Sequence, residues 1–227
     1  MKHILTALAL AITIAASLGQ GITLPPSGGN QKSKVSQWMG PVEVTIPYNS
    51  PDVHDPSGAD RKGHIWGELV HYGYIDQGFG PAKSAPWRAG ANENTTIRFS
   101  HDVSVEGKPV KAGTYGLFLA VEKEGPWTLI LSNNSTSWGS YFYNQAEDAL
   151  RVPVTPADAE YTEFLTFGFD TRTVSSTTAY LQWENKRVPF KVEVPNVTEL
   201  YLATIRNELR NSAGFNYQNW ANAAQYC

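Results

Sequence analysis

The residues whose types and spacing are best suited to chemistry lie in one short segment, residues 87–93. Arg88 presents a planar fork of donors that fits a carboxylate or a phosphate, and Asn92 can donate and accept hydrogen bonds. Glu93 could act as a general acid or base if burial raised its pKa, and Trp87 offers a stacking surface. The segment therefore predicts a binding or catalytic loop. The alternative is structural: Arg88 and Glu93 pair with each other or with the backbone, and Gly90 occupies a turn at positive φ.

Two other segments bring polar or aromatic groups together. Residues 66–73 contain Glu68, His71 and Tyr72, and a histidine can transfer protons near neutral pH. Residues 138–143 begin at Trp138 and include two tyrosines and a phenylalanine, which suits a platform for a sugar or another planar ligand. The alternatives are that His71 is a hydrogen-bonded packing residue and that the aromatic segment packs in the core or in a hairpin.

Motifs that specify particular chemistries are missing from the sequence. It has no phosphate-binding glycine loop, no Gly-x-Ser-x-Gly, no His-Glu-x-x-His and no pair of Cys-x-x-Cys motifs. The histidines His54, His64, His71 and His101 lack the spacing that places two ligands of a strand or helix on one metal ion. We therefore predict no metal site and no bound cofactor.

The elements that must position these residues are mostly strands. Val42, Val44, Ile46 and Tyr48 alternate with more polar residues, which is typical of a strand with one face on a core. Further strands are expected at 95–99, 103–105, 115–121, 127–131, 164–169, 177–183 and 188–194, with turns such as Glu184-Asn185-Lys186 between them. No amphipathic stretch between strands could form a parallel crossover, which disfavours an α/β fold. The pattern predicts an all-β antiparallel sandwich or jelly-roll-like barrel.

Both ends of the chain differ from this pattern. Residues 1–19 have a polar start, an apolar run and small residues, as in a cleaved signal peptide, and residues 20–34 look like a flexible lead-in. The sandwich is expected over 35–195. Residues 196–227 predict a helical tail, with Thr198 and Asn216 as caps and Gly214 as the end of the first helix. The second helical run stops without a terminating signal, so the chain looks cut short. Either the tail packs on the sandwich, or the natural chain continues into more helices.

Composition narrows the classes of partner and the compartment. The formal net charge is −3 over 227 residues, so no basic surface for nucleic acid is expected. Cys227 is the sole cysteine, so an internal disulfide is impossible. The apolar run near the start is too short for a membrane span, and we expect an exported protein, periplasmic or extracellular, without a span after signal cleavage.

The same segments resemble a bacterial domain-of-unknown-function family, DUF2911, over roughly residues 34–194. The resemblance rests on Arg61 with Ile65-Trp66-Gly67-Glu68-Leu69-Val70, on residues 87–93, on Lys111-Ala112-Gly113-Thr114-Tyr115, on Trp138-Gly139-Ser140-Tyr141 and on Arg187-Val188-Pro189-Phe190. This chain has Ala89 and His71 where the family pattern has Thr and Pro, and residues 74–86 look like an insertion. The resemblance implies an exported β-sandwich with Arg88, Asn92 and Glu93 as a shared site. It implies no reaction.

Three hypotheses about function follow. The first is a domain that binds a small molecule or glycan through Trp87, Arg88, Asn92 and Glu93, with Tyr48, Tyr72 and Trp138 as further ligand-binding candidates. The second is a hydrolase or lyase with Glu93 as general acid or base and Arg88 at a developing negative charge, helped by Tyr48, Tyr72 or His71. The third is a protein-interaction module that uses an apolar stripe of the tail, Leu202, Ile205 and Leu209.

Overall fold

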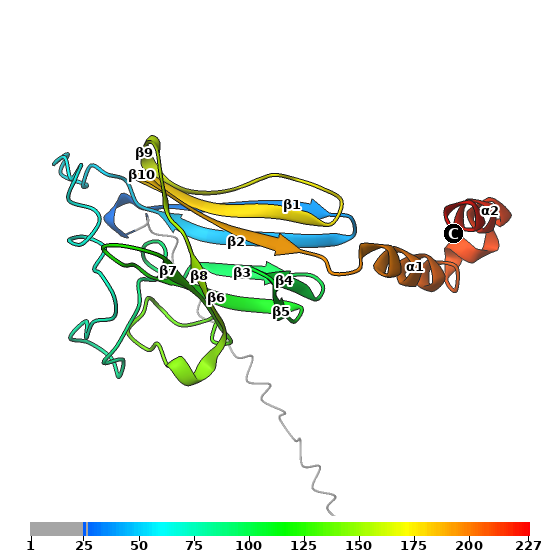
Figure 1. Cartoon of the computed structure of the whole chain (residues 1–227), viewed down its shortest axis with the longest axis horizontal. Coiled ribbons are helices and arrows are strands. Elements are labelled where there is room, and N and C mark those ends of the chain that lie inside the picture. Colours follow the sequence, from blue (N-terminus) through cyan, green and yellow to red (C-terminus); the bar gives the residue numbers. More distant parts are fainter. Residues whose placement is uncertain (1–24, 26) are drawn as a thin grey trace, which may run out of the picture.

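Two antiparallel sheets form the body of the chain (Figure 1). The computed structural model describes residues 25 and 27–227, so the predicted signal peptide lies outside the described residues. One sheet contains β1 (Gln31–Met39), β2 (Val42–Ser50), β3 (Thr96–Phe99), β6 (Gly113–Ala120), β7 (Trp127–Ser132) and β8 (Asp148–Val154). The other contains β4 (Val103–Val105), β5 (Lys108–Val110), β9 (Ala157–Asp170) and β10 (Ser176–Glu193). Their orders are β1-β2-β3-β6-β7-β8 and β5-β4-β10-β9. The predicted antiparallel sandwich is confirmed, and the sheets do not close into a barrel.

The alternation that predicted β2 sets its orientation. Val42, Val44, Ile46 and Tyr48 are buried, whereas the residues between them are at least partly exposed. The same rule applies along β10, where every second residue enters the core on either side of its middle. One continuous apolar core therefore fills the space between the two sheets.

Besides the three-residue β5, two strands were not predicted. β1 begins at Gln31, inside the expected flexible lead-in, and pairs along its whole length with β2 although most of its residues are polar. β8 alternates buried Leu150, Val152 and Val154 with exposed residues, but it contains Pro153, which weakens a strand signal. Both lie at an edge of the larger sheet, where a strand needs pairing on one side only and tolerates polar residues and proline.

The predicted turn Glu184-Asn185-Lys186 is wrong, because β10 continues through it as one strand. The pairing with β9 shifts its register on either side of Glu184, which is a β-bulge irregularity. Glu184 has φ +52, and its buried carboxylate accepts a hydrogen bond from the Gly63 amide. The polar residues that suggested a turn therefore form a bulge within one strand, and Glu184 binds the neighbouring loop through Gly63.

The connection from β2 to β3, residues 51–95, contains no strand or helix and joins the two sheets; we call it the bridging connection. Near its start, the Leu165 amide of β9 donates to the Pro51 carbonyl at 2.9 Å. Near its end, Trp87 and Leu119 of β6 exchange backbone hydrogen bonds of 3.0 and 2.9 Å. It thus crosses from the smaller sheet to the larger one, among the loops at the end of the sandwich away from the C-terminal helices (Figure 1).

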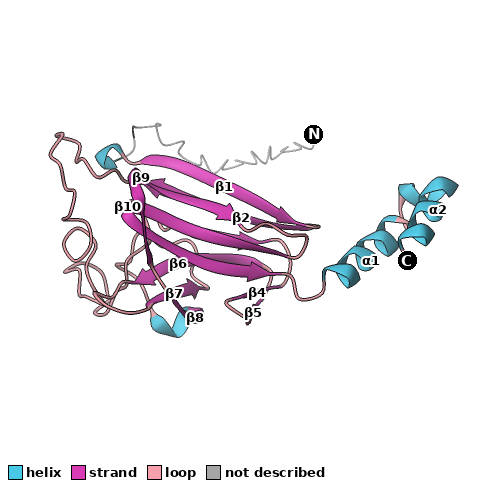
Figure 2. Ribbon diagram, turned by 45° about the horizontal axis from the view of Figure 1, so that its top comes forward, coloured by secondary structure: helices cyan, strands magenta, loops and turns pink. Residues whose placement is uncertain are grey.

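The tail forms α1 (Val197–Glu208), a 3₁₀ turn η3 (Ser212–Phe215) and α2 (Tyr217–Tyr226), which project from the sandwich (Figure 2). Asn196, not the predicted Thr198, caps α1 by accepting from the Glu199 amide, and Gly214 lies in η3 rather than ending the helix. Asn216 caps α2 as predicted. No helix within residues 25 and 27–227 is long and apolar enough to cross a membrane.

Candidate functional site

A cavity of about 300 Å³ lies against the bridging connection, which supplies most of its wall. This volume is at the small end of the range for ligand pockets, roughly 300–1,000 Å³. Trp183 of β10 and two residues ahead of β1 complete the wall. The lining residues are Gly28, Asn30, Pro51, Pro56, Arg61, Leu69, Val70, His71, Gln77, Trp87, Arg88, Gly90, Ala91, Asn92 and Trp183.

The side chain of Arg88 is held in place by its neighbours. Its Nη1 donates to the backbone carbonyl of Asn92 at 2.7 Å. Its Cζ lies 5.3 Å from the ring centre of Trp138 and 5.4 Å from that of Tyr141, which is the range of cation–π attraction. Gly139 lies so close that a Cβ there would be 2.7 Å from Nη1. The guanidinium is therefore held on several sides while it still lines the cavity.

The backbone of residues 87–93 is bent at two non-glycine positions. Ala89 has φ 51 and Asn92 has φ 54, both in the left-handed region that costs a residue other than glycine free energy. The predicted positive φ at Gly90 is wrong. Glycine is needed there because a Cβ would lie 2.7 Å from Thr95 Oγ1 and 3.1 Å from the Asn49 carbonyl oxygen. Close packing against β2 thus shapes the turn that carries Arg88.

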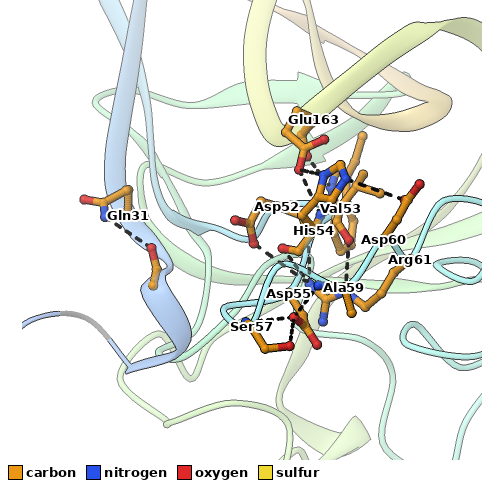
Figure 3. Close-up of polar contacts among 12 residues, drawn as sticks. Gln31, Asp52, Val53, His54, Asp55, Ser57, Ala59, Asp60, Arg61 and Glu163 are labelled. Carbon is orange, nitrogen blue, oxygen red and sulfur yellow. Dashed lines mark hydrogen bonds and ion pairs between the residues drawn. The ribbon is translucent and has the colours of Figure 1, made fainter.

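A second arginine of the cavity, Arg61, is fixed by the loop that it closes (Figure 3). Its Nε donates to the Val53 carbonyl at 3.0 Å and its Nη2 to the Asp52 carbonyl at 2.9 Å, and its nearest carboxylate, that of Asp52, is 3.9 Å away. Within the loop, Asp55 accepts from the Ser57 hydroxyl and the Ala59 amide, and these bonds lower the pKa of Asp55. The wall around Arg61 is therefore built before any ligand arrives.

His71 lines the same cavity and is partly buried. Among the described residues, neither of its ring nitrogens has a hydrogen-bond partner of ordinary geometry, and the same is true of the side-chain oxygen of Gln77. Burial lowers the pKa of His71, and the backbone of Tyr72 and Gly73 offsets part of this effect without a well-formed hydrogen bond. The imidazole is thus neutral at neutral pH and can offer one donor and one acceptor.

A cluster of four indoles lies at the base of the site. Trp66 contacts Trp87, Trp127 and Trp183 with ring centres 5.8, 5.1 and 5.9 Å away, and Trp87 stacks on Trp183 at 6.3 Å. Trp87 is 7% exposed and Trp183 is 1% exposed. Trp87, predicted as an open stacking surface, is therefore chiefly a core residue that also lines the cavity.

Glu93 is adjacent to the loop but does not line the cavity. Its carboxylate binds the Lys32 ammonium and the Asn49 amide, both at 2.9 Å, and not Arg88. The bond with Lys32 is the main reason why the pKa of Glu93 is lowered, whereas a general acid needs a raised pKa. Among the described residues no hydrogen bond joins Glu93 to Tyr48, Tyr72 or His71. The geometry gives the catalytic hypothesis no support.

The other candidates lie in three different places. Tyr48 is a core residue whose ring meets that of Phe167 at 5.0 Å. Tyr72 donates to the Trp66 carbonyl and lines a different hollow, beside Trp127. Trp138 is outside the cavity wall but half-exposed beside Arg88. The structure thus brings together Arg88, Asn92, Trp87 and His71 with Trp138 at the rim, and it separates Glu93, Tyr48 and Tyr72 from them.

Arg61, Gln77 and Trp183 line the cavity with side chains that could contact a ligand, and they were not among the predicted site residues. Arg61 carried part of the family resemblance, which is the one signal that could have singled it out. Trp183 reads as an ordinary strand residue, and Gln77 lies in a stretch that looked like an insertion. No group of three or more His, Cys, Asp or Glu suited to a metal ion occurs in the part of the chain that the structure describes.

Comparison with known families adds to this geometry. The sequence model of DUF2911, described as a protein of unknown function, matches residues 30–192. The chain belongs to the DUF2911 family. The resemblance read from the sequence is thereby confirmed. No curated protein matches this DUF2911 chain, and no solved structure does.

The DUF2911 match covers almost the whole candidate site. Of the residues that line the cavity, Gly28 alone precedes residue 30, and Trp183 lies before the match ends. The helices α1 and α2 lie beyond it. The cavity is therefore a feature of the DUF2911 domain itself, and the helical tail is additional to it.

One pH dependence is expected in this DUF2911 chain at the loop of Figure 3. The ring of His54 is 2.9 Å from the Glu163 carboxylate, and this hydrogen bond raises the pKa of His54 above 6.5. Burial alone would raise the pKa of Glu163, but bonds from the His54 amide, Tyr161 and the His54 ring outweigh it and lower that pKa to about 2. Glu163 is thus ionised whenever His54 titrates. An NMR titration should show that the Glu163→Gln substitution lowers the pKa of His54.

The His54–Glu163 pair also makes the stability of the fold depend on pH. Because the pKa of His54 is raised on folding, the pair stabilises the fold fully below pH 6.5, and this contribution disappears as the pH rises through the folded pKa. Asp60→Asn is the matched control: Asp60 is 4.0 Å from the ring, so its loss should lower the pKa of His54 less. An unchanged pKa in Glu163→Gln would contradict the assignment.

Proposed function

We propose that this chain binds a small molecule or a glycan unit in the cavity beside Arg88, outside the cytoplasm as the predicted signal peptide implies. One observation carries the proposal: a partly buried guanidinium lines a cavity, flanked by aromatic rings, and none of the described residues forms an ion pair with it. A partly buried charge without a counter-charge costs free energy, and an anionic or hydrogen-bonding ligand would recover part of that cost.

The aromatic rim supports a sugar-sized ligand. Trp138 and Tyr141 lie parallel, with ring planes at 6° and centres 5.8 Å apart, next to Arg88. Phe79 meets Tyr141 edge to face at 5.4 Å. Phe79, Trp138 and Phe142 are 65, 50 and 46% exposed. Exposed rings gathered beside a cavity mark a binding surface more often than they serve packing, and the apolar face of a sugar stacks on such rings.

A thermal-shift experiment tests the proposal with neutral sugars, acidic sugars, organic acids and phosphorylated metabolites. At least one class should raise the melting temperature, because a ligand at a hundred times its Kd stabilises the fold by about 2.7 kcal/mol. The rise, measured from each variant's own melting temperature, should shrink in Gly139→Ala, whose Cβ would lie 2.7 Å from Arg88 Nη1 and displace the guanidinium. Because Gly139 has φ +63, alanine there should also lower the starting melting temperature.

The matched control is Glu93→Gln, because Glu93 lies beside the same loop but outside the cavity. This variant should lose stability through its contacts with Lys32 and Asn49 and keep the full ligand-induced rise. If no class of compound shifts the wild type, or if Glu93→Gln and Gly139→Ala lose the shift equally, the cavity is not the binding site.

A protein-binding role of the tail is a second candidate. The predicted stripe of Leu202, Ile205 and Leu209 is only partly exposed, and Ile205 and Leu209 line a groove of α1 with α2. Phe215 and Tyr217, however, are 95 and 81% exposed at the turn between the helices. Large aromatic side chains with this much exposure favour contact with a partner protein.

A further inference from the structure

We propose that the ligand carries an oxyanion, a carboxylate or a phosphate, which Arg88 binds with Arg61 on the same cavity wall. This inference rests on the proposed function and names the chemical class of the ligand. Both anions present oxygens that accept hydrogen bonds from a guanidinium. Titration with uronates and with a sugar phosphate distinguishes the carboxylate from the phosphate.

The charge of the cavity wall is the first argument. Two of its residues are arginines, and none is an aspartate or glutamate. His71 adds a hydrogen-bonding group without adding a charge, since burial favours its neutral form. A pocket with positive groups alone concentrates anions and excludes cations.

The absence of a counter-ion for Arg88 is the second argument. Among the described residues no carboxylate lies within 4.0 Å of it, and the remaining residues, 1–24 and 26, contain no aspartate or glutamate that could supply one. Arg61 has only the distant carboxylate of Asp52, at 3.9 Å. Arg151 and Arg187, by contrast, contact their partner carboxylates closely. Arg172, Arg206 and Arg210 also lack a close carboxylate among the described residues, but they lie outside the cavity wall, so Arg88 and Arg61 are the arginines that can offer their charge to a ligand there.

The geometry of Arg88 is the third argument. A guanidinium has five N–H donors, and within residues 25 and 27–227 Arg88 uses one of them, in its bond to Asn92, which leaves several for a ligand. Trp138, Tyr141 and Gly139 restrict its movement, so little side-chain entropy is lost on binding. A planar, restrained fork suits two oxygens of one carboxylate or phosphate. The cavity volume fits one such unit, for example an acidic monosaccharide.

Isothermal titration with matched pairs tests the inference: glucuronate against glucuronamide, galacturonate against galactose, and glucose 6-phosphate against glucose. We expect the anionic member of at least one pair to bind about tenfold or more tightly than its neutral partner, as a charge-assisted hydrogen bond allows. Added salt should reduce this preference. The uronates and the phosphate report separately which oxyanion is preferred.

Variants locate the preference. Arg88→Gln should abolish it, Arg88→Lys should reduce it because a point charge replaces the fork, and Trp138→Ala should weaken both members of a pair while the preference persists. Arg98→Gln is the matched control, because Arg98 is an exposed arginine of β3 that pairs with Glu43 and is not part of the cavity wall. Equal binding of charged and neutral members would overturn the inference and leave the proposed function standing. Failure of every compound to bind would overturn both.

Discussion

Replacing Trp183 with alanine is expected to lower the free energy of unfolding by about 3–5 kcal/mol, the usual cost of deleting a buried indole. The side chain is 1% exposed and contacts Trp66 and Trp87, and its Nε1 donates to the Glu163 carbonyl at 3.2 Å. Because the same ring forms part of the cavity wall, ligand binding should weaken as well. Urea unfolding followed by circular dichroism measures the first effect, and titration of the folded variant measures the second.

Trp38→Ala is the control for this experiment. Trp38 belongs to β1 but is 57% exposed, so its removal deletes an indole without opening a cavity in the core. It should change the free energy of unfolding by less than about 1 kcal/mol. Similar losses for the two variants would show that the cluster of four indoles is not the centre of stability that its packing indicates.

Glu184→Ala is expected to cost about 1–3 kcal/mol, because it removes the hydrogen bond between a buried carboxylate and the Gly63 amide. Ligand affinity at the cavity should fall as well. Gly63 follows Arg61 by two residues, and its hydrogen bond holds that loop against β10. Chemical denaturation gives the stability, and a Kd measured at a temperature where both proteins are folded gives the effect on the site.

Two companion substitutions separate the hydrogen bond from the backbone. Glu184→Gln keeps an acceptor oxygen and should recover most of the stability. Glu184→Gly deletes the side chain but relieves the strain of φ +52, so it should be less destabilising than the alanine variant. If glutamine and alanine are equally destabilising, the contact with Gly63 is not the source of the effect.

The sequence predicted the fold where the alternation of apolar residues is regular. β2 was found because its buried positions recur every second residue up to Tyr48. β1 was missed because an edge strand needs few apolar residues, and the register that defines it comes from β2. The middle of β10 was misread because Glu184 looks like a turn residue, whereas its burial depends on Gly63, far away in the sequence. Local patterns do not contain such distant contacts.

The same limit applies to the candidate site. Arg88 and Asn92 were singled out from local spacing, and they do line the cavity. Glu93 was grouped with them by adjacency, but the backbone turns at Asn92, which has φ 54, and Glu93 binds Lys32 and Asn49 outside the cavity wall. Arg61 and Trp183 reach the cavity from a distant loop and from β10, so only the folded chain brings them to Arg88.

The arrangement of β4 and β5 affects how the chain folds. The strands of the larger sheet follow one another in order along the chain, so that sheet can grow as the chain is made. The β4–β5 hairpin instead pairs with β10, where Val105 meets Val192 near the end of the sandwich. Contacts between segments so distant in sequence form slowly, because a long loop must close first. We therefore expect one edge of the β4–β5 hairpin to stay unpaired until β10 has formed. Closure of the smaller sheet should then limit the folding rate.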